Sequence, residues 1–173
     1  MFQKLAFLFS IKSLQITCLL LACAIFVTNH PIAFAQDGDP IEEIESHIKK
    51  GKEELAKVKS RKYRGKRKKA VRIKIYFEAL KSFSSALRKL NEYQIEDDQY
   101  FEQLEALFNE VSGIKEVSDQ ISKIDGKLMK ALKKKDYENA NQLAQQLLDL
   151  DERRDTIKYL LPIVSDLTTE TQE

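Results

Sequence analysis

Carboxylates abound in this sequence, as on any charged helical surface, but histidine and cysteine are scarce, and His47 is the first residue to consider for acid–base or metal chemistry. It is the only histidine after residue 35, and histidine is the usual general base and metal ligand near neutral pH. Glu43 lies four residues earlier, so a helix would place both side chains on one face as half of a metal site. A di-metal bundle needs two Glu–His units, and no nucleophile motif surrounds His47. We therefore expect no catalytic, metal-binding or cofactor-binding residue, and no enzymatic activity.

The cysteines and the acidic runs also offer little chemistry. Both cysteines, Cys18 and Cys23, lie in the first 35 residues, so the rest of the chain has no thiol for nucleophilic, redox or zinc chemistry. The acidic runs at 37–39 and 96–98 contain oxygen ligands, but neither continues into a calcium-binding loop. We interpret the first as a flexible start and the second as a helix N-cap.

A basic segment, residues 57–74, is the sharpest feature of the sequence. It contains 11 Lys or Arg residues and no acidic residue. It could be a solvated face, or be neutralised by acidic helices of the same chain. It could instead bind an anionic envelope surface, an acidic protein or nucleic acid. An export signal and a single interleaved aromatic residue argue against nucleic acid. We predict partner contacts through Lys57, Lys59, Arg61, Lys62, Tyr63, Arg64, Lys66, Arg67, Lys68, Lys69, Arg72 and Lys74.

The N-terminal residues, 1–35, have the pattern of a secretory signal peptide. Lys4 and Lys12 precede an apolar run over 14–27, and an Ala-x-Ala cleavage site ends at Ala35. The apolar run is shorter than the ~20 residues of a membrane-spanning helix, which argues against an uncleaved anchor. A lipoprotein lipidated at Cys23 is a further alternative, although apolar residues follow that cysteine. We expect cleavage near Ala35 and a periplasmic or secreted protein.

Charge is balanced over the predicted mature chain, 36–173, but the two signs are separated along it. Residues 49–89 hold 17 basic and 3 acidic residues, whereas residues 91–173 hold 10 basic and 19 acidic residues. Such asymmetry indicates either a directed contact with a partner or complementarity between segments of the chain. The 138 residues of the mature chain are enough to bury an ordinary core without disulfides.

Apolar residues recur every three or four positions, which predicts an all-α fold of five to six antiparallel helices in one domain. Ile41 and Phe101 are among the residues expected to face the core, and Gly51 should let another helix approach closely. The first helical break should lie at 63–66, and Pro162 should kink or split the last helix. The predicted helices span 41–61, 67–91, 97–112, 114–134, 137–150 and 152–167.

Two of these helices carry small and aromatic residues at recurring positions. The patterns are Tyr76-x2-Ala79-x3-Phe83-x2-Ala86-Leu87 and Asp136-Tyr137-x2-Ala140-x3-Ala144-x2-Leu147-Leu148. This spacing resembles the second helix of a tetratricopeptide repeat, in which small residues admit the partner helix. An ordinary amphipathic helix with alanines for close packing would show the same spacing. The resemblance implies a protein-binding scaffold without chemistry of its own, and it assigns no ligand residues.

Together these patterns predict an exported, non-enzymatic scaffold or adaptor that binds a protein partner in a cell-envelope assembly. The basic segment 57–74 would be its electrostatic anchor. The alternative is a periplasmic holdase-like chaperone, or a binder of an anionic envelope surface such as lipid or cell-wall polymer. We expect no nucleic acid partner and no small-molecule substrate.

Overall fold

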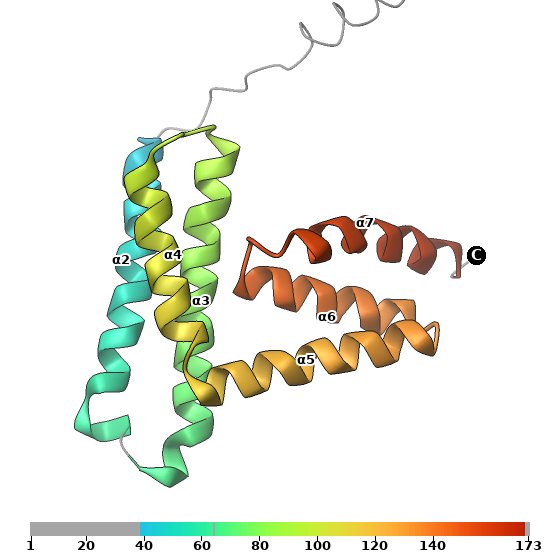
Figure 1. Cartoon of the computed structure of the whole chain (residues 1–173), viewed down its shortest axis with the longest axis horizontal. Coiled ribbons are helices and arrows are strands. Elements are labelled where there is room, and N and C mark those ends of the chain that lie inside the picture. Colours follow the sequence, from blue (N-terminus) through green and yellow to red (C-terminus); the bar gives the residue numbers. More distant parts are fainter. Residues whose placement is uncertain (1–38, 64, 172–173) are drawn as a thin grey trace, which may run out of the picture. The chain divides into compact units, whose positions relative to one another are not determined.

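The computed structural model describes residues 39–63 and 65–171, and these residues form helices and no β-strand (Figure 1). The predicted all-α class is confirmed. The described residues belong to one compact unit. The predicted leader, with its cleavage and lipidation alternatives, lies outside them. The elements are α2 (Pro40–Lys59), the 3-10 helices η1 (Arg61–Tyr63) and η2 (Lys66–Lys68), α3 (Lys69–Glu92), α4 (Asp98–Ser112), α5 (Lys115–Lys133), α6 (Tyr137–Leu150) and α7 (Asp155–Glu170).

Aspartate side chains begin three of the helices. Asp39 accepts a hydrogen bond from the backbone N–H of Ile41 at 2.9 Å, and Pro40 follows it at the first helical position. Asp97 and Asp136 cap α4 and α6 in the same way. A capping carboxylate satisfies a backbone donor and faces the positive end of the helix dipole. These caps fix where α2, α4 and α6 start.

Helices α2 and α3 form the principal hairpin, and Gly51 allows them to approach closely. A Cβ atom at Gly51 would lie 2.2 Å from the Phe83 ring, so only glycine fits without a shift. Phe83 is fully buried and meets Phe108 of α4 edge-on, with ring centroids 6.2 Å apart. Helix α4 thus completes a first core with α2 and α3.

Helices α5, α6 and α7 surround a second core. Ala140 and Ala144 of α6 are fully buried and give α5 and α7 close access, while Leu147 fills the space between them. Ile121 and Ile124 of α5 contact both cores. Helix α3 packs against α6, so the two groups of helices are in direct contact.

The structure differs from the sequence prediction at three places. Ile41 and Phe101 are 44% and 36% exposed, because each lies in the first turn of its helix, before the first buried position. Helix α7 starts at Asp155 rather than 152, because Glu152 turns into the interior beside α3. Of the two outcomes predicted for Pro162, the split is not found, because α7 is continuous and its buried Ile157 and Val164 pack on both sides of the proline; the kink stays a prediction.

Candidate functional site

The basic segment lies at the tip of the α2–α3 hairpin, where the chain reverses (Figure 1). We call residues 57–74 the basic tip. The reversal uses Gly65, whose φ of 115° is a conformation that residues with a side chain rarely adopt. The two 3-10 helices flank this glycine, and η1 packs against α2 while η2 packs against α3. The predicted break at 63–66 is therefore found, with Arg64 outside the described residues.

Most of the cations in the basic tip face solvent. All of its described Lys and Arg side chains are exposed except Arg72, which is half-buried. Lys57 pairs with Glu54 on its own helix. Lys62 lies 5.6 Å from the centroid of the Tyr63 ring. In the described part of the chain, no salt bridge is made by Arg61, Lys62, Lys66, Arg67, Lys68, Lys69 or Lys74.

The start of α3 concentrates positive potential at the same place. Its first turn has no acidic residue, and its N-cap, Lys68, makes no capping hydrogen bond through its side chain. The positive end of the helix dipole therefore points toward Lys66, Arg67, Lys68 and Lys69, an arrangement that is unfavourable for the isolated chain. An anion at the tip would remove this repulsion.

Arg72 holds the tip together rather than facing solvent. Its Nη1 donates to the carbonyl oxygens of Tyr63 at 3.1 Å and Gly65 at 2.7 Å. Its Nη2 donates to the carboxylate of Glu116, in the first turn of α5, at 3.2 Å. One guanidinium thus fixes both sides of the reversal and ties them to α5. Among the predicted contact residues that the structure describes, Arg72 is the one whose guanidinium makes hydrogen bonds to several groups of the protein.

A hollow of about 690 Å³ lies on the inner side of the tip. Lys66 and Lys69 line it, Val58 contributes apolar surface, and Tyr76 and Glu116 belong to the α3 and α5 sides. Burial raises the pKa of the Tyr76 hydroxyl above its usual 10.0, Arg72 opposes this rise, and Glu116 adds to it. The hydroxyl is therefore a stable hydrogen-bond donor at neutral pH.

The acidic C-terminal half uses its carboxylates elsewhere. Glu152 pairs with Arg88 of α3 at 3.1 Å and with Lys158 of α7 at 3.1 Å. Both carboxylate oxygens of Asp125, in α5, accept a hydrogen bond from Nη2 of Arg154, each at 2.8 Å. Arg72–Glu116 is a salt bridge between the basic tip and α5. Within the described residues, the acidic C-terminal half forms no salt bridge with Arg61, Lys62, Lys66, Arg67, Lys68, Lys69 or Lys74.

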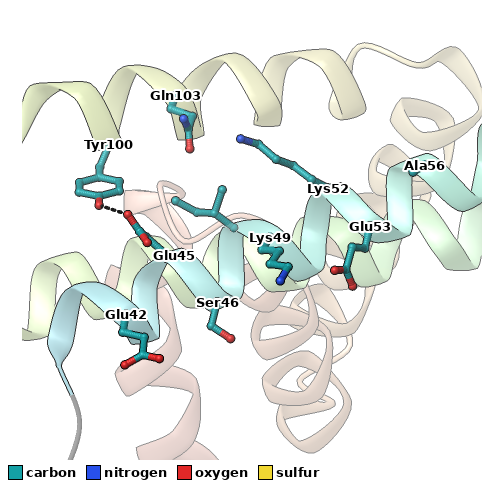
Figure 2. Close-up of a pocket in the computed structure, with 10 residues that line it drawn as sticks. Glu42, Glu45, Ser46, Lys49, Lys52, Glu53, Ala56, Tyr100 and Gln103 are labelled. Carbon is teal, nitrogen blue, oxygen red and sulfur yellow. Dashed lines mark hydrogen bonds between the residues drawn. The ribbon is translucent and has the colours of Figure 1, made fainter.

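A second candidate surface is a groove of about 860 Å³ between α2 and α4 (Figure 2). Its buried apolar residue is Ile48, and its rim carries both charge signs, with Lys49 and Lys52 between acidic residues. Figure 2 shows Lys52 reaching from α2 toward α4, and Tyr100 donating across the groove to Glu45 at 2.9 Å. Sequence reasoning missed this groove, because its two walls are about 55 residues apart in sequence.

His47 lies on α2, away from the tip, and is half-buried. Burial lowers the pKa of its imidazole, while the nearby Glu43 carboxylate opposes that shift. Glu43 itself accepts a hydrogen bond from the Tyr93 hydroxyl at 2.6 Å, and this bond is the main reason for its lowered pKa. Over residues 39–63 and 65–171, no group of three His, Cys, Asp or Glu side chains is arranged to hold a metal ion.

None of the described helices is both long enough and apolar enough to cross a bilayer. The sequence and the fold match no protein-family model, no curated protein and no solved structure.

Proposed function

We propose that this protein is an exported, non-enzymatic helical adaptor that binds a protein partner in a cell-envelope assembly and uses the basic tip as its electrostatic anchor. The observation that supports this proposal most strongly is the lack of neutralisation at the tip. Seven exposed cations share one reversal of the chain, and none makes a salt bridge within the described residues. Like charges held together in this way favour an anionic partner over the free state.

The chemistry of the tip supports binding rather than bond-making. Lys and Arg side chains supply charge and hydrogen-bond donors, and at neutral pH they carry no lone pair for proton abstraction. The hairpin that carries them has a close-packed interior around Gly51 and Phe83, so the tip sits on a stiff support. A stiff support lowers the ordering cost of association.

The α2–α4 groove supports the protein-partner half of the proposal. It follows α2 from Glu42 to Ala56, about four helical turns, with a buried isoleucine and a charged rim. Amphipathic helices bind grooves of this kind through spaced apolar anchors. The partner would therefore place a small apolar side chain on Ile48 and, opposite each charged residue of the rim, a charge of the opposite sign.

The test is affinity capture from envelope extract with the protein produced in its own cells, together with determination of its N-terminal residue. We expect export, a mature chain beginning near Gln36, and one stoichiometric protein partner. The variant Arg67→Glu/Lys68→Glu/Lys69→Glu should capture much less of that partner, because it lacks the anchor that holds the protein at the envelope. Its matched control, Lys127→Glu/Lys130→Glu/Lys133→Glu, makes the same change of charge on α5 and should keep it. Equal capture by both variants, or an intracellular protein, would contradict the proposal.

A further inference from the structure

We infer that the basic tip binds the anionic headgroups of a lipid bilayer. This inference rests on the proposed function, since it names the partner of the electrostatic anchor. A bilayer surface with anionic lipids attracts each nearby Lys or Arg additively, without a complementary shape. The tip presents its charges in a form that suits such a surface better than a protein or a nucleic acid.

The first argument is the balance of charge and apolar surface. A protein–protein interface has an apolar core from which charged residues are depleted, and lysine is depleted in particular. The described part of the basic tip has one large apolar side chain that is exposed, Val71 at 41%. Its exposed side chains are otherwise those of Lys57, Lys59, Arg61, Lys62, Lys66, Arg67, Lys68, Lys69 and Lys74, with the small residues Ser60 and Ala70. The tip therefore lacks the centre of a protein interface but has a dense array of cations.

The second argument is where Val71 lies. On α3, Val71 and Lys74 are three residues apart and share a helix face, and both are exposed. Lys68, three residues before Val71, lies directly before the start of α3. A small apolar side chain flanked by cations matches the interface of a bilayer, where the ammonium groups meet phosphates and the apolar group enters the headgroup layer.

The third argument is access. The tip is the free end of the α2–α3 hairpin, and Figure 1 shows it away from α6 and α7. Two acidic residues form ion pairs with the tip: Glu116 with Arg72, and Glu54 with Lys57. The carboxylates of Glu116 and Glu54 are therefore already paired when a flat anionic surface approaches the cations. Proteins that bind single-stranded nucleic acid stack the bases on aromatic side chains, and Tyr63 is the one aromatic residue in the segment.

The experiment is co-sedimentation of the full chain with vesicles of phosphatidylcholine alone or of phosphatidylcholine mixed with phosphatidylglycerol. Any contribution from residues 1–35 is common to all variants, so the quantity measured is the excess binding to the anionic vesicles. We expect such an excess for the natural protein and its loss at ~1 M salt, where charges are screened within about 3 Å. Arg67→Gln/Lys68→Gln/Lys69→Gln should reduce the excess roughly a hundredfold, at about fivefold per charge.

The matched control is Lys127→Gln/Lys130→Gln/Lys133→Gln, which should retain most of the excess. Helical content and thermal unfolding should be the same for all three proteins. Equal losses in both variants would show a response to net charge alone and overturn the inference. So would unchanged binding in the tip variant, or binding to an oligonucleotide or polyglutamate under conditions where vesicles do not bind. Tip-dependent capture of a protein without vesicle binding would overturn the lipid inference and leave the adaptor proposal standing. Vesicle binding without a protein partner would overturn the adaptor proposal and leave the lipid inference standing.

Discussion

Arg72 and Glu116 join the start of α3 to the start of α5, with a guanidinium nitrogen 3.2 Å from a carboxylate oxygen across 44 positions of sequence. The same guanidinium donates to the carbonyl oxygens of Tyr63 and Gly65. A cation inside the basic tip is thus used to order its neighbours rather than to meet a partner. Arg72 therefore positions the basic tip, whereas the exposed cations around it are available for binding.

The first prediction concerns this positioning role. Arg72→Lys keeps the charge but loses the planar fork that reaches three acceptors at once. We expect unchanged helical content, faster trypsin cleavage after Arg67, and weaker binding to anionic vesicles although the net charge is the same. Mass spectrometry of the first cleavage products measures the change. Lys74→Arg, at an exposed position without a salt bridge, is the control and should behave as the natural protein does. Equal cleavage rates in all three would refute the positioning role.

The second prediction concerns two glycines in helices. Gly51→Ala would place a Cβ 2.2 Å from Phe83, so the helices must shift, at a cost of about 1–3 kcal/mol. The better helix propensity of alanine offsets at most ~1 kcal/mol of this destabilisation. Gly126 of α5 has no atom within 4 Å of the same position, so Gly126→Ala should stabilise the protein by up to ~1 kcal/mol. Denaturant unfolding should therefore give shifts of opposite sign, and a stabilised Gly51→Ala would mean that α2 and α3 are not in close contact there.

The third prediction concerns two buried serines of α3. Ser84 is 1% exposed, and its hydroxyl accepts a hydrogen bond from the backbone N–H of Glu152 at 2.9 Å. Ser84→Ala leaves that N–H buried without an acceptor and should cost about 1–3 kcal/mol of unfolding free energy. Ser82 donates to the carbonyl of Glu78 in its own helix, so Ser82→Ala should be neutral or slightly stabilising. If both variants unfold at the same denaturant concentration, Ser84 does not fasten the α6–α7 connection to α3.

The fourth prediction concerns pH. Burial lowers the pKa of His47 from 6.5, so the unfolded chain binds a proton to this residue at a higher pH than the folded chain does. Stability from this residue is therefore complete above pH 6.5 and declines as the pH falls below it. Glu43 also has a lowered pKa, but its stabilisation declines only below its ordinary value of 4.5. Unfolding midpoints measured down to about pH 5 should fall for the natural protein and fall less for His47→Gln. Identical profiles would show that His47 is solvated in the folded state.

Local sequence signals were enough to predict the helices, with ends that differ by a few residues from those observed. The caps at Asp39, Asp97 and Asp136 lie within a few residues of the donors that they satisfy, so their positions can be read from short patterns. The reversal near Gly65 is likewise a local feature. Gly51 indicated a close approach, but its partner, Phe83, is set by the register of two helices and was not identified.

The arrangement of the site could not be predicted in the same way. The sequence placed the cations in one segment, but nothing local marks Arg72 as occupied, because its carboxylate partner belongs to α5. The α2–α4 groove depends on the same kind of distant pairing. The acidic half could have neutralised the tip, and only the fold shows that Glu152 and Asp125 are paired elsewhere. The tetratricopeptide resemblance stays a prediction: Ala79, Phe83 and Ala86 are buried, as they would be in any close-packed hairpin.

Helix α2 joins the basic tip to Asp39, and its 20 residues set the distance between them at about 30 Å. If the tip binds the anionic surface of a bilayer, α2 would therefore keep Asp39 at a fixed distance from that surface. The hairpin would then be a rigid spacer, and its length would set the distance from the bilayer at which the protein can contact a second molecule.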